Sequence, residues 1–292
     1  MSDEGALSSL LDRVGRWNLR RLGARGRMVD GPGGAALHLY ELPGGGDVPL
    51  VLLHGVGSSA STFGPLVKRL LPSFGPIVLP EAPAHGKSAA PAGGLDAETL
   101  FTSVAAALDG LDAAPFVLYG NSLGGGAALR YAIERPERVR ALVLLSPAGA
   151  RTDQDELDAL VATFRLETTG EARAFMRRLF HKKRWWQRLA ARDLRRRLAH
   201  PPVRDMLAQA EVGDQLDPRD VEGLPMPVLF MWGEAERVLP ASHLAWFRAH
   251  LPPQARVVEP PHFGHSAYIE YPADVAREII AFCAPADAVS AA

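Results

Sequence analysis

The residues of this 292-residue chain that are best suited to chemistry surround Ser122. Ser122 lies in the run G-N-S-L-G (120–124), after the apolar stretch 116–119 and before a helix-forming stretch at 125–134. Glycines two residues on either side permit a sharp strand-to-helix turn that exposes the serine hydroxyl at its tip. The hydroxyl then lies at the positive end of the following helix. The pattern predicts a nucleophilic serine rather than an ordinary glycine-rich turn.

A serine hydroxyl is a poor nucleophile near neutral pH, so it needs a base, and the base needs an acid that orients it. Among nine histidines, His265 is the predicted base, because it lies in a short loop after the last expected strand and before the last expected helix. Such a loop opens at the carboxyl ends of the strands. His262, three residues earlier, is the competitor, and its alternative role is a loop histidine bonded to the backbone.

The acid is expected between the serine and the histidine in the chain. The expected strand 228–232 is followed by a turn that contains Glu234 and Glu236. We predict Glu236 as the acid, because it lies further round the turn and so faces a histidine from the next loop better. Glu234 fits a solvated acidic turn. Two further carboxylates follow another expected strand and remain alternatives: Asp153 and Asp155.

Attack on a carbonyl develops negative charge on its oxygen, which positioned backbone N–H groups can stabilise. One donor should be the N–H of Leu123, directly after the serine, and the other should come from the loop H-G-V-G (54–57). We predict the Val56 N–H as this second donor. His54 precedes the glycine turn at a strand end, so a structural hydrogen bond is favoured for it over a role as base.

The elements that would position these residues alternate between strands and helices. Strands are expected at 37–41, 48–54, 77–79, 116–119, 139–145, 228–232 and 256–258, and helices at 62–70, 98–108, 125–134, 242–250 and 272–282. The first two strands should be neighbours joined by the glycine turn 44–46. The alternation predicts an α/β fold with a mainly parallel central sheet and helices on both faces.

This alternation stops between residues 151 and 224, where helical patterns occur without a convincing strand. We therefore expect a core at 28–150 and 225–284, interrupted by a helical lid insertion at 151–224. Residues 1–27 should form an amphipathic extension that packs on its own domain rather than lying on a membrane. The tail 285–292 is expected to be disordered.

Composition excludes several classes of protein. A formal net charge of −1 gives no argument for nucleic-acid binding, and a single cysteine excludes an intramolecular disulfide. No apolar run approaches the roughly 20 residues that span a membrane, and no signal-peptide core is present, so a cytoplasmic protein is expected. No carboxylate and histidine cluster has ligand spacing, so neither a metal nor a cofactor is expected.

The expected lid is basic although the chain is nearly neutral. Residues 171–200 carry many arginines and lysines against only two acidic residues. Phe175, Trp185 and Trp186 are interleaved with them, so amphipathic helices could line an acyl pocket. These three side chains would then bind the acyl chain of the substrate. Their basic side could meet anionic lipid or a carboxylated substrate. The alternative is a solvated basic face with tryptophans packed on the core.

These features resemble the α/β-hydrolase superfamily over nearly the whole chain. The resemblance implies the α/β-hydrolase fold for the core. Glu81 replaces an aspartate that is usual before the turn at 86–88, and its role is expected to be structural. The matching segments follow the order of the family: 54–55, 84–88, 120–124, 233–240 and 264–265.

The resemblance implies a catalytic role for five of the residues named above. Ser122 would be the nucleophile and His265 the base. The oxyanion donors would be Val56 and Leu123. Glu236 lies where most members carry aspartate; its carboxylate is the same, but its arm is longer.

Within the superfamily, the elbow and the run S-P-A-G (146–149) resemble esterases and lipases of the monoacylglycerol-lipase kind. We therefore expect a serine hydrolase that cleaves small-molecule esters of an apolar acyl chain through an acyl-enzyme on Ser122. Alternatives are hydrolysis of a carbon–carbon, lactone or N-terminal amide bond, or a catalytically idle binding protein, which the unusual Glu236 favours. A lipid surface that contacts the basic lid is a second candidate partner.

Overall fold

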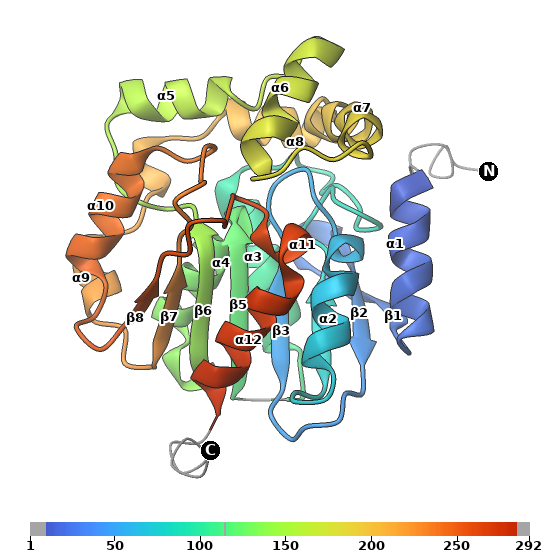
Figure 1. Cartoon of the computed structure of the whole chain (residues 1–292), viewed down its shortest axis with the longest axis vertical. Coiled ribbons are helices and arrows are strands. Elements are labelled where there is room, and N and C mark those ends of the chain that lie inside the picture. The colour runs from blue at the N-terminus through green and yellow to red at the C-terminus, as the bar shows by residue number, and fades with distance from the viewer. Residues whose placement is uncertain (1–9, 114, 285–292) are drawn as a thin grey trace.

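The computed structural model of the chain describes residues 10–113 and 115–284. Its centre is an eight-stranded sheet with the order β1-β2-β4-β3-β5-β6-β7-β8 (Figure 1). The first three strands in this order pair antiparallel, and the remaining neighbours pair parallel. The strands are β1 (Arg25–Asp30), β2 (Ala36–Leu42), β3 (Leu50–Leu53), β4 (Ile77–Pro80), β5 (Phe116–Ser122), β6 (Val139–Pro147), β7 (Val228–Met231) and β8 (Arg256–Val258).

Helices cover both faces of this sheet. One apolar layer joins the sheet to α2 (Gly64–Leu70) and α12 (Pro272–Cys283), and α11 (Ala267–Glu270) lies on the same side. The other layer joins it to α3 (Ala97–Asp109), α4 (Leu123–Glu134) and α10 (Ala241–His250). Short 3-10 turns complete the connections: η2 (Pro32–Gly34), η3 (Ala60–Phe63), η4 (Pro136–Arg138) and η5 (Val212–Asp214).

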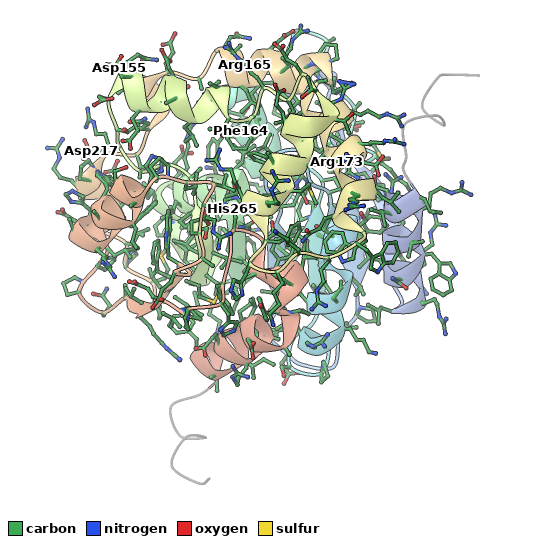
Figure 2. All side chains as sticks on the ribbon, turned by 45° about the horizontal axis from the view of Figure 1, so that its top comes forward. Asp155, Phe164, Arg165, Arg173, Asp217 and His265 are labelled. Carbon is green, nitrogen blue, oxygen red and sulfur yellow. The ribbon has the colours of Figure 1, made fainter. Side chains whose placement is uncertain are left out.

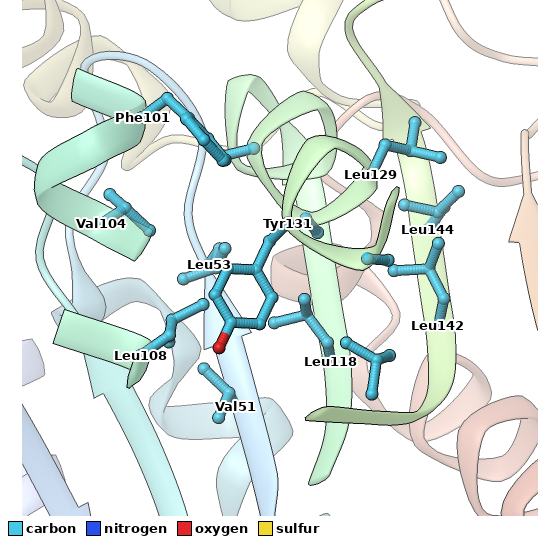
Figure 3. Packing of buried hydrophobic residues seen from close by; sticks show 14 of the residues in the cluster. Val51, Leu53, Phe101, Val104, Leu108, Leu118, Leu129, Tyr131, Leu142 and Leu144 are labelled. Carbon is cyan, nitrogen blue, oxygen red and sulfur yellow. The ribbon is translucent and has the colours of Figure 1, made fainter. Parts of the chain in front are cut away.

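The two layers arise from the alternation of side chains along each strand. Val51 and Leu53 of β3 face the α3 and α4 layer, whereas Leu50 and Leu52 face the α2 and α12 layer. Figure 3 shows the first layer, in which Tyr131 lies among leucine and valine side chains of strands and helices. Because both faces are covered, the central strands carry continuous apolar runs.

One expected pairing was wrong. β2 and β3 are not neighbours, because β4 lies between them and pairs antiparallel with β2 and parallel with β3. After β3 the chain passes through α2 and returns as β4. This strand occupies the edge of β3 where β2 had been expected to pair. The expected α/β fold, with a mainly parallel central sheet and helices on both faces, is confirmed.

The segment between β6 and β7, called here the helical insertion (residues 151–224), is built from helices. Figure 1 shows α5 to α8 above the carboxyl ends of the central strands, in yellow-green to yellow. The insertion has an apolar cluster of its own that includes Phe164, Phe175, Phe180 and Leu198. Its helices are α5 (Gln154–Ala162), α6 (Thr169–Leu179), α7 (Gln187–Leu198), α8 (Pro201–Ala208) and α9 (Pro218–Glu222).

The first described element, α1 (Leu10–Arg21), lies beside the sheet and packs on η3 and α2. Leu19 is buried in the α2 and α12 layer, and a Cβ at Gly15 would lie 2.7 Å from the Ser61 carbonyl oxygen. β1 follows directly, so the boundary expected at residue 27 falls inside a strand of the sheet. The predicted tail 285–292 lies outside the described residues.

No helix within residues 10–113 and 115–284 combines the length and the hydropathy that crossing a bilayer requires. The cytoplasmic location stays a prediction.

Candidate active site

Ser122 lies at the last position of β5, where the chain turns directly into α4. Its backbone has φ 55° and ψ −124°, a left-handed conformation that is uncommon for a residue with a side chain. A Cβ at Gly120 would lie 2.3 Å from the Gly124 carbonyl oxygen, and one at Gly124 would lie 2.5 Å from that of Leu53. The glycines are therefore required by close backbone approach, and the sharp turn holds Ser122 at the helix start.

Glu236 and His265 form a buried pair. The Nδ1 atom of His265 lies 2.8 Å from Oε2 of Glu236, and the two side chains are only 4% and 2% exposed. The other carboxylate oxygen accepts hydrogen bonds from the backbone N–H groups of Val238, at 2.6 Å, and Leu239, at 3.1 Å. The structure thus brings the predicted acid and base together through the longer arm of glutamate.

The Glu236 carboxyl is held in its charged form. Burial alone would raise its pKa, but the adjacent His265, the Ser146 hydroxyl and the Val238 N–H lower the pKa below its usual range. A buried carboxylate that accepts from Nδ1 fixes the imidazole with its proton on Nδ1 and leaves Nε2 as a base. The pair can therefore accept a proton and hold an imidazolium.

The alternative acids lie elsewhere. Glu234 is exposed. Asp153 is the N-cap of α5, where it accepts a hydrogen bond from the Glu156 N–H at 2.9 Å. Figure 2 shows Asp155 on the outer helix α5, away from His265.

The alternative base is also engaged elsewhere. Nε2 of His262 lies 3.1 Å from Oδ2 of Asp274, at the start of α12. Its ring also packs edge-on against Tyr271. His262 therefore belongs to the packing of the last helix, and its partner is a carboxylate rather than the expected backbone group.

The loops that carry the serine, the acid and the histidine lie against one another. The Asn121 side-chain amide donates to the carbonyl oxygens of Leu145, at 2.9 Å, and His265, at 3.0 Å. A Cβ at Gly233 would lie 1.9 Å from the Phe263 carbonyl oxygen, which also accepts a hydrogen bond from the N–H of Ala235. The positioning role of Asn121 was not foreseen, since sequence alone does not place the His265 loop beside it.

The loop after β3 packs directly on the serine. A Cβ at Gly55 would lie 3.0 Å from that of Ser122, so a side chain at this position would crowd the serine. In the part of the chain that the structure describes, neither the Val56 N–H nor the Leu123 N–H donates a hydrogen bond to another protein group. Leu123 is the first residue of α4, whose first N–H groups have no intrahelical acceptor. Both predicted donors are therefore available to a substrate.

Two buried histidines hold this loop in place. His54 Nδ1 donates to the Gly55 carbonyl oxygen at 2.9 Å, and its Nε2 accepts from the Ala82 N–H at 3.1 Å. Both backbone partners dictate the neutral ring, and burial lowers the pKa of His54. The structural hydrogen bond expected for His54 is present.

His85 completes this support, and sequence reasoning had missed it. Its Nδ1 donates to the Pro83 carbonyl oxygen at 2.9 Å, and its Nε2 accepts from the Gly57 N–H at 3.1 Å. Burial, together with the neighbouring His54, lowers its pKa to about 3. The neutral ring therefore joins the 81–88 loop to the loop that carries Val56.

A cavity of about 360 Å³ opens at Ser122 and His265. Val56 lines it, and so do Phe175 and Trp186, two of the three side chains that the sequence predicted for the pocket. Trp185 does not: its side chain is 78% exposed, because Trp186 is the tryptophan that turns inward against Phe180. In the described part of the chain, no group of three or more histidine, cysteine or acidic side chains gathers as a metal site would require.

An unexpected wall of this cavity comes from α1. Asp12 of this helix is buried and lies 2.6 Å from Nη2 of Arg197 on α7, and it accepts hydrogen bonds from Ser59 and Ser61. Burial would raise the pKa of Asp12, but Arg197 and these donors lower it. Arg197 also donates to the Gly57 carbonyl oxygen at 3.3 Å. An acidic residue within an apolar helical pattern was the only signal in the sequence.

The site combines a strained serine at a strand-to-helix turn, a buried histidine–carboxylate pair and two free N–H groups. On this sheet, such a combination is typical of an α/β hydrolase. Residues 50–278 match the family model described as "Alpha/beta hydrolase family". The chain belongs to that family.

Two relatives and one solved structure illustrate the range of similar proteins. The acetyltransferase component of the acetoin cleaving system of Pseudomonas putida is 31% identical, over 86% of this chain and 67% of its own. The pimeloyl-[acyl-carrier protein] methyl ester esterase of Nitrosomonas europaea is 30% identical, over 82% and 96%. A membrane phospholipase A, described as a bacterial virulence factor, superposes with a TM-score of 0.79 at 23% identity, covering 97% of this chain and 92% of its own. The last likeness supports the fold alone.

Proposed function

We propose that the protein is a serine hydrolase that cleaves carboxylic esters through an acyl-enzyme on Ser122. The observation that carries this proposal is the buried Glu236–His265 hydrogen bond of 2.8 Å, whose histidine lines the same cavity as Ser122. A catalytically idle protein would have no need of an ionised carboxylate buried against a histidine, because unpaired burial of such groups is costly. The esterase of Nitrosomonas europaea, similar over almost all of its length, supports the choice of ester.

The first half of the reaction forms the acyl-enzyme. Nε2 of His265 accepts the Ser122 proton as Oγ attacks the ester carbonyl carbon, and the carbonyl oxygen becomes an oxyanion. The N–H groups of Val56 and Leu123 donate to that oxyanion. Collapse of the tetrahedral intermediate breaks the bond to the alcohol, which leaves with the proton from His265.

The second half returns the free enzyme. His265 accepts a proton from water, whose oxygen attacks the acyl carbon, and the same two N–H groups stabilise the second oxyanion. Collapse releases the carboxylic acid and returns the proton to Ser122. Throughout, Glu236 holds the imidazole by its Nδ1–H and stabilises the imidazolium that forms twice in each turnover.

The substrate we propose is a small-molecule ester with an apolar acyl chain. Phe164, Phe175, Met176 and Trp186 from the helical insertion give the cavity an apolar wall. Such a wall favours a hydrocarbon chain, since its burial removes apolar surface from water. We propose the insertion as a lid on the same ground, because its helices line the cavity that Ser122 also lines.

The test compares Ser122→Ala with the intact protein. Ester turnover should fall by about four to six orders of magnitude, and covalent labelling by a fluorophosphonate probe should disappear, because both need the serine oxygen. A series of p-nitrophenyl esters of increasing acyl length measures turnover, and a lactone and a carbon–carbon substrate measured beside it test the rival bond types.

The matched control is Ser58→Ala, since Ser58 also lines the cavity but bonds to Thr62 and Tyr268 instead. This variant should keep its probe labelling. Labelling of the Ser122→Ala variant at the intact level would overturn the nucleophile. Absence of labelling and turnover in the intact protein would instead identify an idle binding protein.

A further inference from the structure

Large apolar side chains are exposed on two elements that border the cavity. On α1, Leu10, Val14 and Trp17 are 69%, 46% and 53% exposed. At the start of α7, Trp185 and Leu189 are 78% and 49% exposed. Apolar side chains gathered in this way are typical of surfaces that bind a partner.

The three residues on α1 form one stripe. Their spacing of four and three residues places them on the same face of the helix. The opposite face carries the buried Asp12 and Leu19. The helix is therefore packed on its own domain by one side and turns a continuous apolar side outward.

Basic side chains surround both apolar groups. On α1, Arg13, Arg20 and Arg21 are exposed, and the Arg21 guanidinium lies 4.8 Å from the centre of the Trp17 ring. The acidic residue of this helix, Asp12, is buried. Around Trp185, the exposed basic residues are Lys182, Lys183, Arg184, Arg188 and Arg192.

The two groups belong to one region of the molecule. The 2.6 Å contact between Asp12 and Arg197 joins α1 to the last turn of α7, and Figure 1 shows these helices on the same side of the protein. Trp186, next to Trp185 before the first turn of α7, lines the same cavity as Val14 of α1. Val14 is 46% exposed and also lines the cavity, so the cavity reaches the surface beside the apolar stripe.

We propose that α1 and the start of α7 together form a docking surface for an anionic lipid surface. Aromatic and aliphatic side chains ringed by arginine and lysine suit the boundary between acyl chains and acidic headgroups. A second copy of the chain would bring these basic groups against one another. The proposal rests on the proposed function in one respect: an apolar ester held in the lipid would enter the cavity beside Val14.

The experiment measures co-sedimentation of the full chain, carrying Ser122→Ala, with vesicles of phosphatidylcholine and phosphatidylglycerol at 7:3. The inactive background keeps binding separate from hydrolysis. Partitioning should be at least tenfold stronger than to pure phosphatidylcholine, and it should weaken at high salt because screening reduces the attraction to anionic headgroups.

Two sets of variants localise the surface. The pair Trp17→Asp and Trp185→Asp should reduce partitioning at least tenfold, whereas Val257→Asp, at an exposed apolar position on the edge strand β8, should leave it unchanged. The pair Arg188→Glu and Arg192→Glu tests the electrostatic half at two exposed positions. Circular dichroism and thermal unfolding identify any variant that fails to fold.

Three results would overturn the proposal: no binding to the anionic vesicles, binding of both variant pairs as strong as that of the Ser122→Ala protein, or self-association that the tryptophan pair abolishes. The last would assign the surface to a second copy. Vesicle binding without ester turnover in the intact protein would leave the docking surface standing and remove the proposed function. Turnover without vesicle binding would do the reverse.

Discussion

The two sides of the candidate site use buried histidines in opposite ways. On one side, Nδ1 of His265 donates to the Glu236 carboxylate, and the ring lines the cavity. On the other side, His54 and His85 bond only to backbone groups, each with one carbonyl oxygen and one N–H. A backbone N–H that donates to Nε2 requires that nitrogen to carry no proton, so these two rings are neutral.

The comparison shows that burial alone does not make a histidine reactive. The partner of the ring decides whether it exchanges protons or serves as a fixed bridge between loops. In this site the proton-exchanging ring and the bridging rings serve different tasks: one moves the serine proton, and the others hold the loop of Val56 at the serine.

Of the changes proposed here for the two sides, Glu236→Gln should cause the largest loss of activity, because it alters the partner of His265. An amide keeps the shape but removes the charge that stabilises the imidazolium, so kcat should fall by about two to four orders of magnitude. Steady-state kinetics on a short, soluble ester measures the loss.

The control for this change is Glu234→Gln, because Glu234 is exposed on the same turn. That variant should retain kcat. If it lost activity while Glu236→Gln kept it, the acid role would move to Glu234 and the comparison between the two sides would fail.

His85→Leu should reduce stability and activity by a smaller amount, because it removes a ring that bridges two loops on the second side. The Gly57 N–H and the Pro83 carbonyl oxygen would lose their partner, at a cost of about 1–3 kcal/mol in the free energy of unfolding. The loop of Val56 would be held less firmly, so kcat should fall about tenfold, corresponding to roughly 1.4 kcal/mol of transition-state stabilisation. Probe labelling should persist, because Ser122 and His265 remain.

His262→Leu is the matched control, since His262 pairs with Asp274 at the start of α12. Its kcat should stay at the level of the intact protein. A loss of kcat in this variant equal to that of His85→Leu would show that removal of any histidine perturbs the site.

Lowering the pH should reduce the folding stability that the neutral His85 ring provides. The unfolded His85 binds a proton below its ordinary pKa of 6.5, whereas the folded ring binds one only near its lowered pKa of about 3. Folding stability is therefore lost as the pH falls from 6.5 towards 3, by about 1.4 kcal/mol per pH unit. Because His85→Leu lacks this term, its deficit relative to the intact protein should shrink by about 2 kcal/mol between pH 7.5 and pH 5. Urea unfolding at both pH values measures the deficit, and a constant deficit would contradict a neutral His85.

Sequence reasoning located the strands that are buried on both faces, because their apolar runs are continuous. It missed β1, whose residues are almost all exposed and give no apolar alternation. The placement of β4 between β2 and β3 was beyond it too, since strand order depends on contacts between distant segments.

The same limit applies to the site. Ser122, His265 and Glu236 could be predicted because each sits in a local pattern that its chemistry demands. The bridge made by His85, the amide of Asn121 and the wall made by α1 rest on partners far along the chain, as with Asp12 and Arg197. Residue types alone do not reveal such partners.

The two N–H groups that hold the second oxygen of Glu236 have a consequence for conformational entropy. A glutamate has one more rotatable bond than an aspartate, and a free side chain of that length would sample many rotamers between turnovers. The hydrogen bonds from Val238 and Leu239 select one rotamer when the chain folds. The ordering is thus complete before any substrate arrives, so the extra methylene adds reach without adding freedom to the step in which the imidazolium forms.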